Sequence, residues 1–320
     1  MMSPKVLVTG AGGFVGEALV FRLLQDGNYR PIAAVRGQTR LLGLCPVQSF
    51  DLLDEVRTPA LEDVQIIVHA AARVHVMQEQ AEDVLAEFRR INVDGTLRLA
   101  RRAVSAGVKR FIFISSIKVN GETTIPGKPF TADDAPRPLD PYSVSKLEAE
   151  LALMQLGRDS GMEVVIIRPS LVYGPGVKAN FRSMMEWLDK GIPLPLGSIR
   201  NRRSLVSVAN LVSLIIACLD HPAAANQVFL VSDGIDLSTT QLLRHLSSAL
   251  GRVACLIPFP ASLLTLVASL LGRRAIAQKV CSSLQVDINK NREILGWAPP
   301  VGIGRAMLQT ARHYKDEKAK

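Results

Sequence analysis

The sequence is poor in cysteine and in aromatic residues. Its four cysteines (Cys45, Cys218, Cys255 and Cys281) lie far apart, with no CxxC pair and no Cys/His cluster. This spacing argues against a zinc site or any other metal site and against a disulfide framework. It is typical of a reducing compartment, so we expect a cytoplasmic protein. Four tyrosines and two tryptophans give few rings on which nucleic-acid bases could stack.

Long apolar runs are also missing. The longest, at 261–271 (ASLLTLVASLL), is too short to span a bilayer and contains two serines and a threonine. We expect a buried core helix there, with a helix lying on a membrane surface as the alternative. The N-terminus has no long apolar core with a cleavage site of the signal-peptide kind. We therefore expect no integral membrane segment.

The charge balance is basic, with 38 Lys and Arg against 29 Asp and Glu, a formal net charge of +9. An excess of this kind favours an anionic partner. The basic residues are scattered, and a small anionic ligand accounts for the same excess as nucleic acid would, so charge alone does not decide between them. The 48% hydrophobic and 21% charged content is that of a globular chain with one large or two modest domains.

Short apolar runs alternate with amphipathic stretches over the first 170 residues. Apolar runs of strand length that are hydrophobic on both faces are typical of parallel strands covered by helices on each side. Helical patterns occur at about 14–26, 83–106 and 142–160. The alternation predicts an α/β fold with an open, doubly wound parallel sheet. The expected strands are 5–9, 31–36, 65–70, 110–115, 163–168 and, later in the chain, 227–232.

After Pro169 the alternation gives way to segments rich in glycine and proline, and the chain from about 235 is mostly helical. These changes predict a nucleotide-binding domain and a smaller, mostly helical C-terminal substrate domain. The expected boundaries are 1–170 with about 204–234 for the first domain, and 171–203 with 235–320 for the second.

A glycine loop follows the first expected strand. Its sequence, TGAGGFVG at 9–16, includes Phe14 and Val15 and leads directly into a helix. Gly10 permits a tight turn, Gly13 lets a ligand approach the backbone, and Gly16 lets helix and strand pack closely. The free N–H groups of the helix favour an anion such as a pyrophosphate. The sequence therefore predicts a dinucleotide site.

The residues after the neighbouring strands bear on the choice of dinucleotide. A site that prefers NAD usually has a carboxylate at the end of the second strand, where Val35 and Arg36 stand. Val35 offers no acceptor for a ribose hydroxyl, and Arg36 can pair with a 2′-phosphate. We therefore favour NADP(H), with NAD(H) as the alternative. The expected contacts along the rest of the dinucleotide are Asp51 and Leu52 at the adenine and the main chain at Ala70 and Ala71.

Tyr142 and Lys146 lie one turn apart on the helix expected at 142–160, so they share a face. An ammonium beside a phenol lowers the tyrosine pKa towards the working pH, as general acid/base chemistry requires. The strand at 110–115 leads into Ser116 at the sheet edge where ligands of such folds bind. Ser116, Tyr142 and Lys146 are thus the candidate catalytic residues.

Together these motifs resemble the extended short-chain dehydrogenase/reductase family, which includes the NAD-dependent epimerases and dehydratases. TGxxGxxG at 9–16, Ser116, YxxxK at 142–146, HAAA at 69–72 and RPSLVYGPG at 168–176 carry the resemblance over nearly the whole chain. It implies a Rossmann-type fold, Tyr142 as general acid/base, Lys146 on the nicotinamide ribose and Ser116 on the sugar oxygen. It also implies a homodimer formed through helices 83–106 and 142–160. The resemblance further implies cofactor-site positions at Phe14, Val15, Asn92 and Pro169.

For the substrate, the resemblance implies a UDP-sugar held by Asn180 and by Arg203. The chain departs from the family pattern at Ser204 and Ser207, where Asp and His are common. It also lacks the downstream Arg-Arg-x-Gly-Asp stretch, so a second diphosphate arginine is in doubt, with Arg273 or Arg274 as weak substitutes.

Three functions remain open at this point. Ile117 and Lys118 after Ser116 replace the acidic pair of a dehydratase, so dehydration is disfavoured. Val35 and Arg36 favour an exchanging NADPH, hence reduction at C4 of a UDP-4-keto-6-deoxy-hexose, expected to be N-acetylated, for surface polysaccharide precursors. The alternative is a UDP-hexose 4-epimerase that retains NAD. A catalytically inactive dinucleotide-binding regulator is the second alternative.

Overall fold

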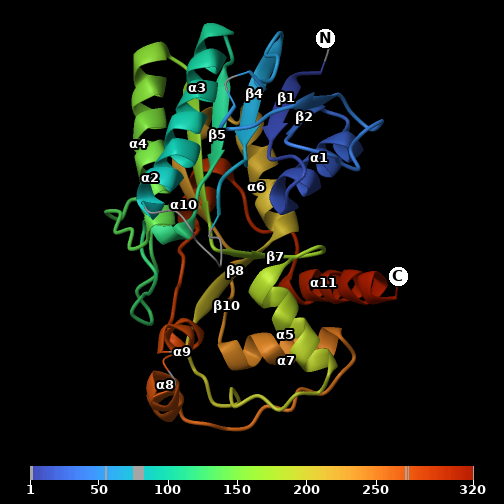
Figure 1. Ribbon diagram of the computed structural model, residues 1–320, viewed down its shortest axis with the longest axis vertical. Coiled ribbons are helices and arrows are strands. Elements are labelled where there is room, and N and C mark those ends of the chain that lie inside the picture. Colours follow the sequence, from blue (N-terminus) through green and yellow to red (C-terminus); the bar gives the residue numbers. More distant parts are fainter. Residues whose placement is uncertain (1–2, 55, 75–82, 271, 273, 320) are drawn as a thin grey trace.

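A parallel sheet forms the centre of the larger part of the protein (Figure 1). The structure is a computed structural model, and it describes residues 3–54, 56–74, 83–270, 272 and 274–319, without the side chains of 274–276. Among these residues, seven parallel strands pair in the order β3-β2-β1-β4-β5-β6-β9. Their bounds are β1 Lys5–Thr9, β2 Arg30–Val35, β3 Val47–Ser49, β4 Val64–His69, β5 Arg110–Ile114, β6 Glu163–Pro169 and β9 Val228–Val231.

Helices cover both faces of this sheet, and each face has its own apolar core. Val6 and Val8 of β1 pack with one set of helices, whereas Leu7 between them packs with the other set. The doubly wound α/β fold expected from the sequence is therefore confirmed. On one face lie α1 Phe14–Asp26, α6 Val208–Asp220 and, near β9, α10 Asn289–Leu295. On the other lie α2 Val84–Arg89, α3 Thr96–Ser105 and α4 Pro141–Ser160 (Figure 1).

The helix expected at 83–106 is not continuous. A π-helical segment, Arg90–Gly95, joins α2 to α3. A Cβ atom on Gly95 would lie 2.7 Å from the carbonyl oxygen of Leu52, so the chain passes that loop in direct contact. Insertions of this kind re-aim side chains and occur frequently at functional sites. Here the segment carries Asn92.

The smaller part of the protein contains strands that the sequence did not suggest. Within the described residues, a second sheet has the order β10-β8-β7, with β8 antiparallel to β10 and parallel to β7. Tyr173 and Phe181 stack in a third core beneath it. The predicted helical character is confirmed for the elements around this sheet. The elements are β7 Leu171–Tyr173, α5 Ala179–Asp189, β8 Arg203–Ser207, β10 Asp236–Leu237, α7 Thr239–Ala249 and α11 Ile303–Lys318.

The apolar run at 261–271 forms α8 Ala261–Leu270, followed by α9 Arg274–Cys281. None of the residues of α8 is buried. The prediction of a buried core helix is therefore wrong: α8 packs on α9 at the end of the molecule opposite the N-terminus (Figure 1) and keeps much of its apolar surface exposed. Of the helices in the described part of the chain, none is long and apolar enough to cross a membrane.

Candidate active site

The glycine loop between β1 and α1 can be built only with glycine at two positions. Gly10 has φ +66°, and a Cβ there would lie 2.7 Å from the backbone nitrogen of Ala71. A Cβ on Gly16 would lie 2.3 Å from the carbonyl oxygen of Gly10, because α1 begins directly against the loop. Gly13 is exposed at the N-terminus of α1. The loop thus leaves a surface of bare backbone at a helix N-terminus, where a pyrophosphate is favoured.

The other expected cofactor positions surround this loop. Ala70 and Ala71 run directly beneath Gly10. Asp51 and Leu52 border a cavity of about 330 Å³, and the Asp51 carboxylate accepts a hydrogen bond from the Leu53 N–H at 3.0 Å. Phe14 and Val15 are partly buried in the first turn of α1, and Pro169 is buried at the end of β6.

The end of β2 carries an apolar residue and then an arginine, as the sequence indicated. Val35 is buried at the last position of the strand, and Arg36 after it is exposed. The neighbouring Arg40 is engaged elsewhere, with its guanidinium paired to Glu17 of α1. Arg36 is therefore the exposed cation directly at the end of the strand.

Ser116 and Tyr142 lie close together at the carboxyl edge of the sheet, near enough for the Ser116 hydroxyl to influence the pKa of the phenol. Burial raises the pKa of Tyr142 to about 12, the negative charge of Asp140 adds to this, and the nearby Ser116 hydroxyl opposes it. The expectation that Lys146 holds the tyrosine pKa down is therefore wrong for this structure. The edge of the Phe88 ring packs against the tyrosine, with the ring centroids 6.0 Å apart.

Lys146 is buried on the same helix, one turn further on. Burial lowers its pKa to about 7, opposed in part by the charge of Glu150. Its Nζ lies 4.0 Å from the centroid of the Phe113 ring, and no hydrogen-bond acceptor for it is found among the described residues. Because a buried amine without an acceptor is costly, this position suits a ligand hydroxyl.

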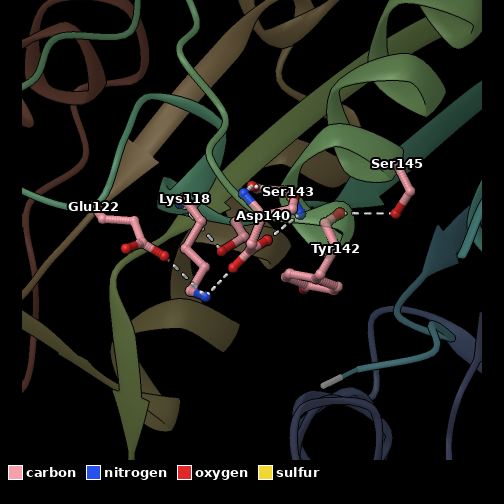
Figure 2. A network of polar contacts seen from close by, with 7 residues as sticks. Lys118, Glu122, Asp140, Tyr142, Ser143 and Ser145 are labelled. Atoms are coloured by element: carbon pink, nitrogen blue, oxygen red, sulfur yellow. Dashed lines mark hydrogen bonds and ion pairs between the residues drawn. The ribbon is translucent and has the colours of Figure 1, made fainter. Parts of the chain in front are cut away.

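A polar network connects the two catalytic segments, and no sequence motif had indicated it (Figure 2). Lys118, two residues after Ser116, forms ion pairs with Asp140 and with Glu122. Asp140 caps α4 by accepting a hydrogen bond from the Ser143 N–H at 2.7 Å, two residues before Tyr142. Burial alone would raise the pKa of the Asp140 carboxyl, but the hydrogen bonds from Lys118 and Ser143 hold it below its usual value. The sequence signal for the cap is Asp-Pro at the start of the helix.

Asn92 lies in the π-helical segment and contacts two other segments of the site. Its amide holds the main chain of Arg73, accepting from the N–H at 2.8 Å and donating to the carbonyl at 3.1 Å. The same amide donates to the hydroxyl of Ser145, at 3.1 Å, between Tyr142 and Lys146. Asn92 thereby ties the chain after β4 to the catalytic helix.

The two expected substrate residues are not brought together with the catalytic pair by any contact among the described residues. Asn180 is exposed in the first turn of α5. Arg203 opens β8, and its guanidinium donates to the carbonyl oxygens of Lys279 at 2.7 Å and Ser282 at 3.3 Å. Burial lowers the pKa of Arg203. Their roles stay predictions.

The two departures from the family pattern have structural roles. Ser204 donates to Asp236 at 2.6 Å and accepts from the Val286 N–H, so it joins β8 to its neighbours. Ser207 is the N-cap of α6. Neither hydroxyl is left for a substrate. Arg273 lies outside the described residues, as does the side chain of Arg274.

Comparison with known proteins identifies the family. The model of the NAD dependent epimerase/dehydratase family matches residues 6–232. The chain belongs to this family. It is an enzyme of the epimerase/dehydratase type, as the resemblance implied, and the inactive-regulator alternative is set aside.

Individual members of the epimerase/dehydratase family resemble the chain over its full length. It is 48% identical to a UDP-glucose 4-epimerase of Vibrio cholerae, over 98% of this chain and 96% of the relative. It is 25% identical to the N-acetyl-alpha-D-glucosaminyl-diphospho-ditrans,octacis-undecaprenol 4-epimerase of Escherichia coli O157:H7, over 98% and 96%. The fold matches that of a UDP-glucuronic acid 4-epimerase from Bacillus cereus in complex with NAD, with a TM-score of 0.78, 21% identity and coverage of 98% and 99%.

Proposed function

We propose that the protein is a UDP-hexose 4-epimerase that retains NAD. One observation carries the proposal: 48% identity over nearly the full length of a relative named UDP-glucose 4-epimerase. The meeting of Ser116 and Tyr142 at the sheet edge supports it. The reading favoured from the sequence, a 4-reductase, has no comparable relative among those described above.

The residues around the glycine loop fit a dinucleotide. Side chains at Gly10 and Gly16 would collide with the backbone, so the loop is shaped for close approach rather than for packing. The buried Lys146 amine has an unused donor for a ribose hydroxyl. The glycine loop and Lys146 would hold the dinucleotide, whose nicotinamide would supply the acceptor and donor of a hydride at C4 of the sugar.

The proton chemistry belongs to Tyr142. We assign its phenolic oxygen the removal of the O4 proton as C4 is oxidised and the return of that proton as C4 is reduced. The Ser116 hydroxyl, which lies close to the phenol, would hold O4 in line with it. Lys146 would hold the dinucleotide and place a positive charge within the apolar wall formed by Phe113.

The substrate site is proposed for the smaller part of the protein. Asn180 would contact the sugar nucleotide and Arg203 its diphosphate, with the Arg203 guanidinium held by carbonyl oxygens at the end of α9. The proposed division is residues 1–170 with about 204–234 for the dinucleotide, and 171–203 with 235–320 for the sugar nucleotide. An N-acetylated hexose is one candidate substrate, since the Escherichia coli relative is named for an N-acetylglucosaminyl diphosphate.

A second candidate, NADPH-dependent 4-reduction, is favoured by the end of β2. Exposed Arg36 supplies a cation for a 2′-phosphate. Buried Val35 supplies no carboxylate that could accept a hydrogen bond from a 2′-hydroxyl. An epimerase that retains NAD needs no such selectivity, because its cofactor does not exchange. The two functions therefore differ in what the purified protein carries.

The test is to denature freshly purified protein and identify the released dinucleotide by mass spectrometry. The epimerase proposal expects about one NAD per chain. If the protein carries no dinucleotide, or only traces of NADP, the epimerase proposal is wrong and the 4-reductase takes its place. The Arg36→Asp variant is the matched comparison: it should lower NADPH affinity at least tenfold only if Arg36 contacts a 2′-phosphate.

We also propose a homodimer formed through α2, α3 and α4. Leu151 on α4 is 62% exposed, a large apolar side chain on the face away from the sheet. The Leu151→Arg variant should sediment as a monomer where the wild type sediments as a dimer. A monomeric wild-type protein would contradict this part of the proposal.

A further inference from the structure

The exposed side of α8 carries an apolar stripe that no described part of the chain covers. Its large exposed side chains are Leu263, Leu266, Val267 and Leu270, at helical positions i, i+3, i+4 and i+7. Leu266 is 57% exposed and Leu270 is 80% exposed. This spacing places the four side chains on one face of the helix, as in a helix that lies on an apolar partner.

Further apolar side chains are exposed on the two loops that lead to this end of the molecule. The loops lie side by side, since the N–H of Leu194 donates to the carbonyl oxygen of Cys255 and the N–H of Ile257 donates back to Leu194. They expose Ile192, Val253 and Ile257. In Figure 1 the loops run along the edge that α8 also occupies, opposite the N-terminus.

A basic pocket lies next to the helices at this end. Arg200, Arg202 and Arg244 line a cavity of about 630 Å³ at the start of α7. None of the three has an ion-pair partner among the described residues. The same loop is fastened to α9, because the Asn201 amide donates to the carbonyl oxygens of Val280 and Ser282, and α8 packs on α9.

The charge around α8 is mainly basic, although Asp236 also lines the arginine cavity and Arg252 pairs with Asp189. Between Arg252 and Val286 the sequence has four Lys or Arg residues and no Asp or Glu. An apolar helical stripe next to arginines that have no ion-pair partner is the pattern of a helix that lies in the surface of an anionic membrane.

We infer that α8 and the arginine pocket form a docking surface for an anionic lipid bilayer. The apolar stripe would enter the headgroup boundary, and Arg200, Arg202 and Arg244 would contact lipid phosphates. A second copy of the chain fits less well, because a two-fold contact through this face would bring three arginines of each copy towards each other with Asp236 as the one acidic residue lining the cavity. The inference stands apart from the epimerase proposal and needs no substrate to be tested.

The experiment is co-sedimentation of the full-length protein with vesicles of phosphatidylethanolamine and phosphatidylglycerol, and with vesicles of phosphatidylcholine alone. We expect binding to the anionic vesicles that weakens as salt is added, and little binding to phosphatidylcholine. The Leu266→Gln/Leu270→Gln variant should lose affinity by about tenfold or more. The Arg200→Gln/Arg202→Gln/Arg244→Gln variant should lose both affinity and salt dependence.

The matched control is Leu42→Gln/Leu308→Gln, which changes leucines that are 76% and 49% exposed elsewhere on the surface. It should bind vesicles as the wild type does, and equal melting temperatures would show that all variants are folded. The inference is overturned if the wild-type protein does not sediment with anionic vesicles or if control and test variants bind alike. It is also overturned if the α8 variant changes only the sedimenting mass of the protein, which would make this face a contact between copies.

Discussion

The Lys118→Met substitution should raise the pKa of Tyr142. Lys118 pairs with the Asp140 carboxylate, and the charge of Asp140 already raises the tyrosine pKa. Both partners are partly exposed, with 35% and 27% of their side-chain surfaces accessible, so solvent screens the effect. An unpaired charge at such a position shifts a neighbouring pKa by about half a unit to one unit, roughly 0.7–1.4 kcal/mol.

The sign follows from the role of the phenol. A higher pKa means that the oxygen gives up its proton only at higher pH, so the rising limb of the kcat profile moves to higher pH by the same half unit to one unit. At a fixed pH on that limb, kcat should fall about three- to tenfold. The measurement is the pH profile of kcat, with absorbance titration of the phenol, taken as wild type minus Tyr142→Phe, as the direct readout.

Two further variants separate electrostatics from folding. Asp140→Asn keeps a good N-cap for α4 but removes the charge, so it should lower the pKa of Tyr142. The double variant Lys118→Met/Asp140→Asn should return the profile towards wild type, and Lys118→Arg should leave it nearly unchanged. The reasoning is refuted if Lys118→Met leaves the phenol titration unmoved, or if the double variant is shifted as far as Lys118→Met alone.

Three other substitutions test the site. Tyr142→Phe should lower kcat by about a thousandfold or more while dinucleotide affinity stays within a few-fold, by calorimetry; loss of binding would contradict the assigned role. Lys146→Met should lower activity yet raise the unfolding temperature, by more at pH 6 than at pH 10. Burial lowers the pKa of the Lys146 amine from 10.5 to about 7, so below pH 10.5 the unfolded chain binds this proton more strongly than the folded protein does, and the lysine destabilises the fold. An equal gain in unfolding temperature at both pH values would contradict this explanation. Gly10→Ala should unfold the protein at lower denaturant and abolish dinucleotide binding, whereas Gly27→Ala, also at positive φ but with open space around it, should cost only about 1 kcal/mol; similar losses would rule out the steric argument.

Six of the seven strands of the main sheet could be predicted because they are largely buried on both faces, whereas the short edge strand β3, which is partly exposed, was not expected. Continuous apolar runs such as 110–115 and 163–168 leave little choice of structure, and the strand limits agree to within one or two residues. The glycine loop and the Tyr142–Lys146 pair were found because each lies within a few residues of sequence. Residues that are this close in sequence stay close in the folded structure, so their spacing alone predicts that they lie together.

What the sequence did not reveal depends on contacts between distant residues. The second sheet is made of strands of two to five residues whose pairing joins β7 to β10 across more than sixty positions of the chain. The Lys118–Asp140 pair is 22 residues apart and exists only because Ser116 and α4 meet at the sheet edge. Gly95, at the end of the π-helical segment, lies against the main chain of Leu52, a contact between distant residues that no local pattern records.

The apolar run at 261–271 shows the limit of reasoning from hydrophobicity alone. An apolar helix is equally consistent with a core and with a surface that binds a partner, and only the packing of α8 on α9 distinguishes the two. Helical spacing correctly placed Lys146 one turn from Tyr142. It did not show that burial and the charge of Asp140 determine the direction of the Tyr142 pKa shift.

The most direct test of the proposed function is proton NMR of UDP-glucose deuterated at C4, incubated with the purified protein and no added cofactor. A 4-epimerase that retains NAD should produce UDP-galactose until the two sugars reach equilibrium, with the deuterium still at C4. Absence of interconversion, together with oxidation of added NADPH when a UDP-4-keto-6-deoxy-hexose is supplied, would contradict the epimerase and establish the reductase.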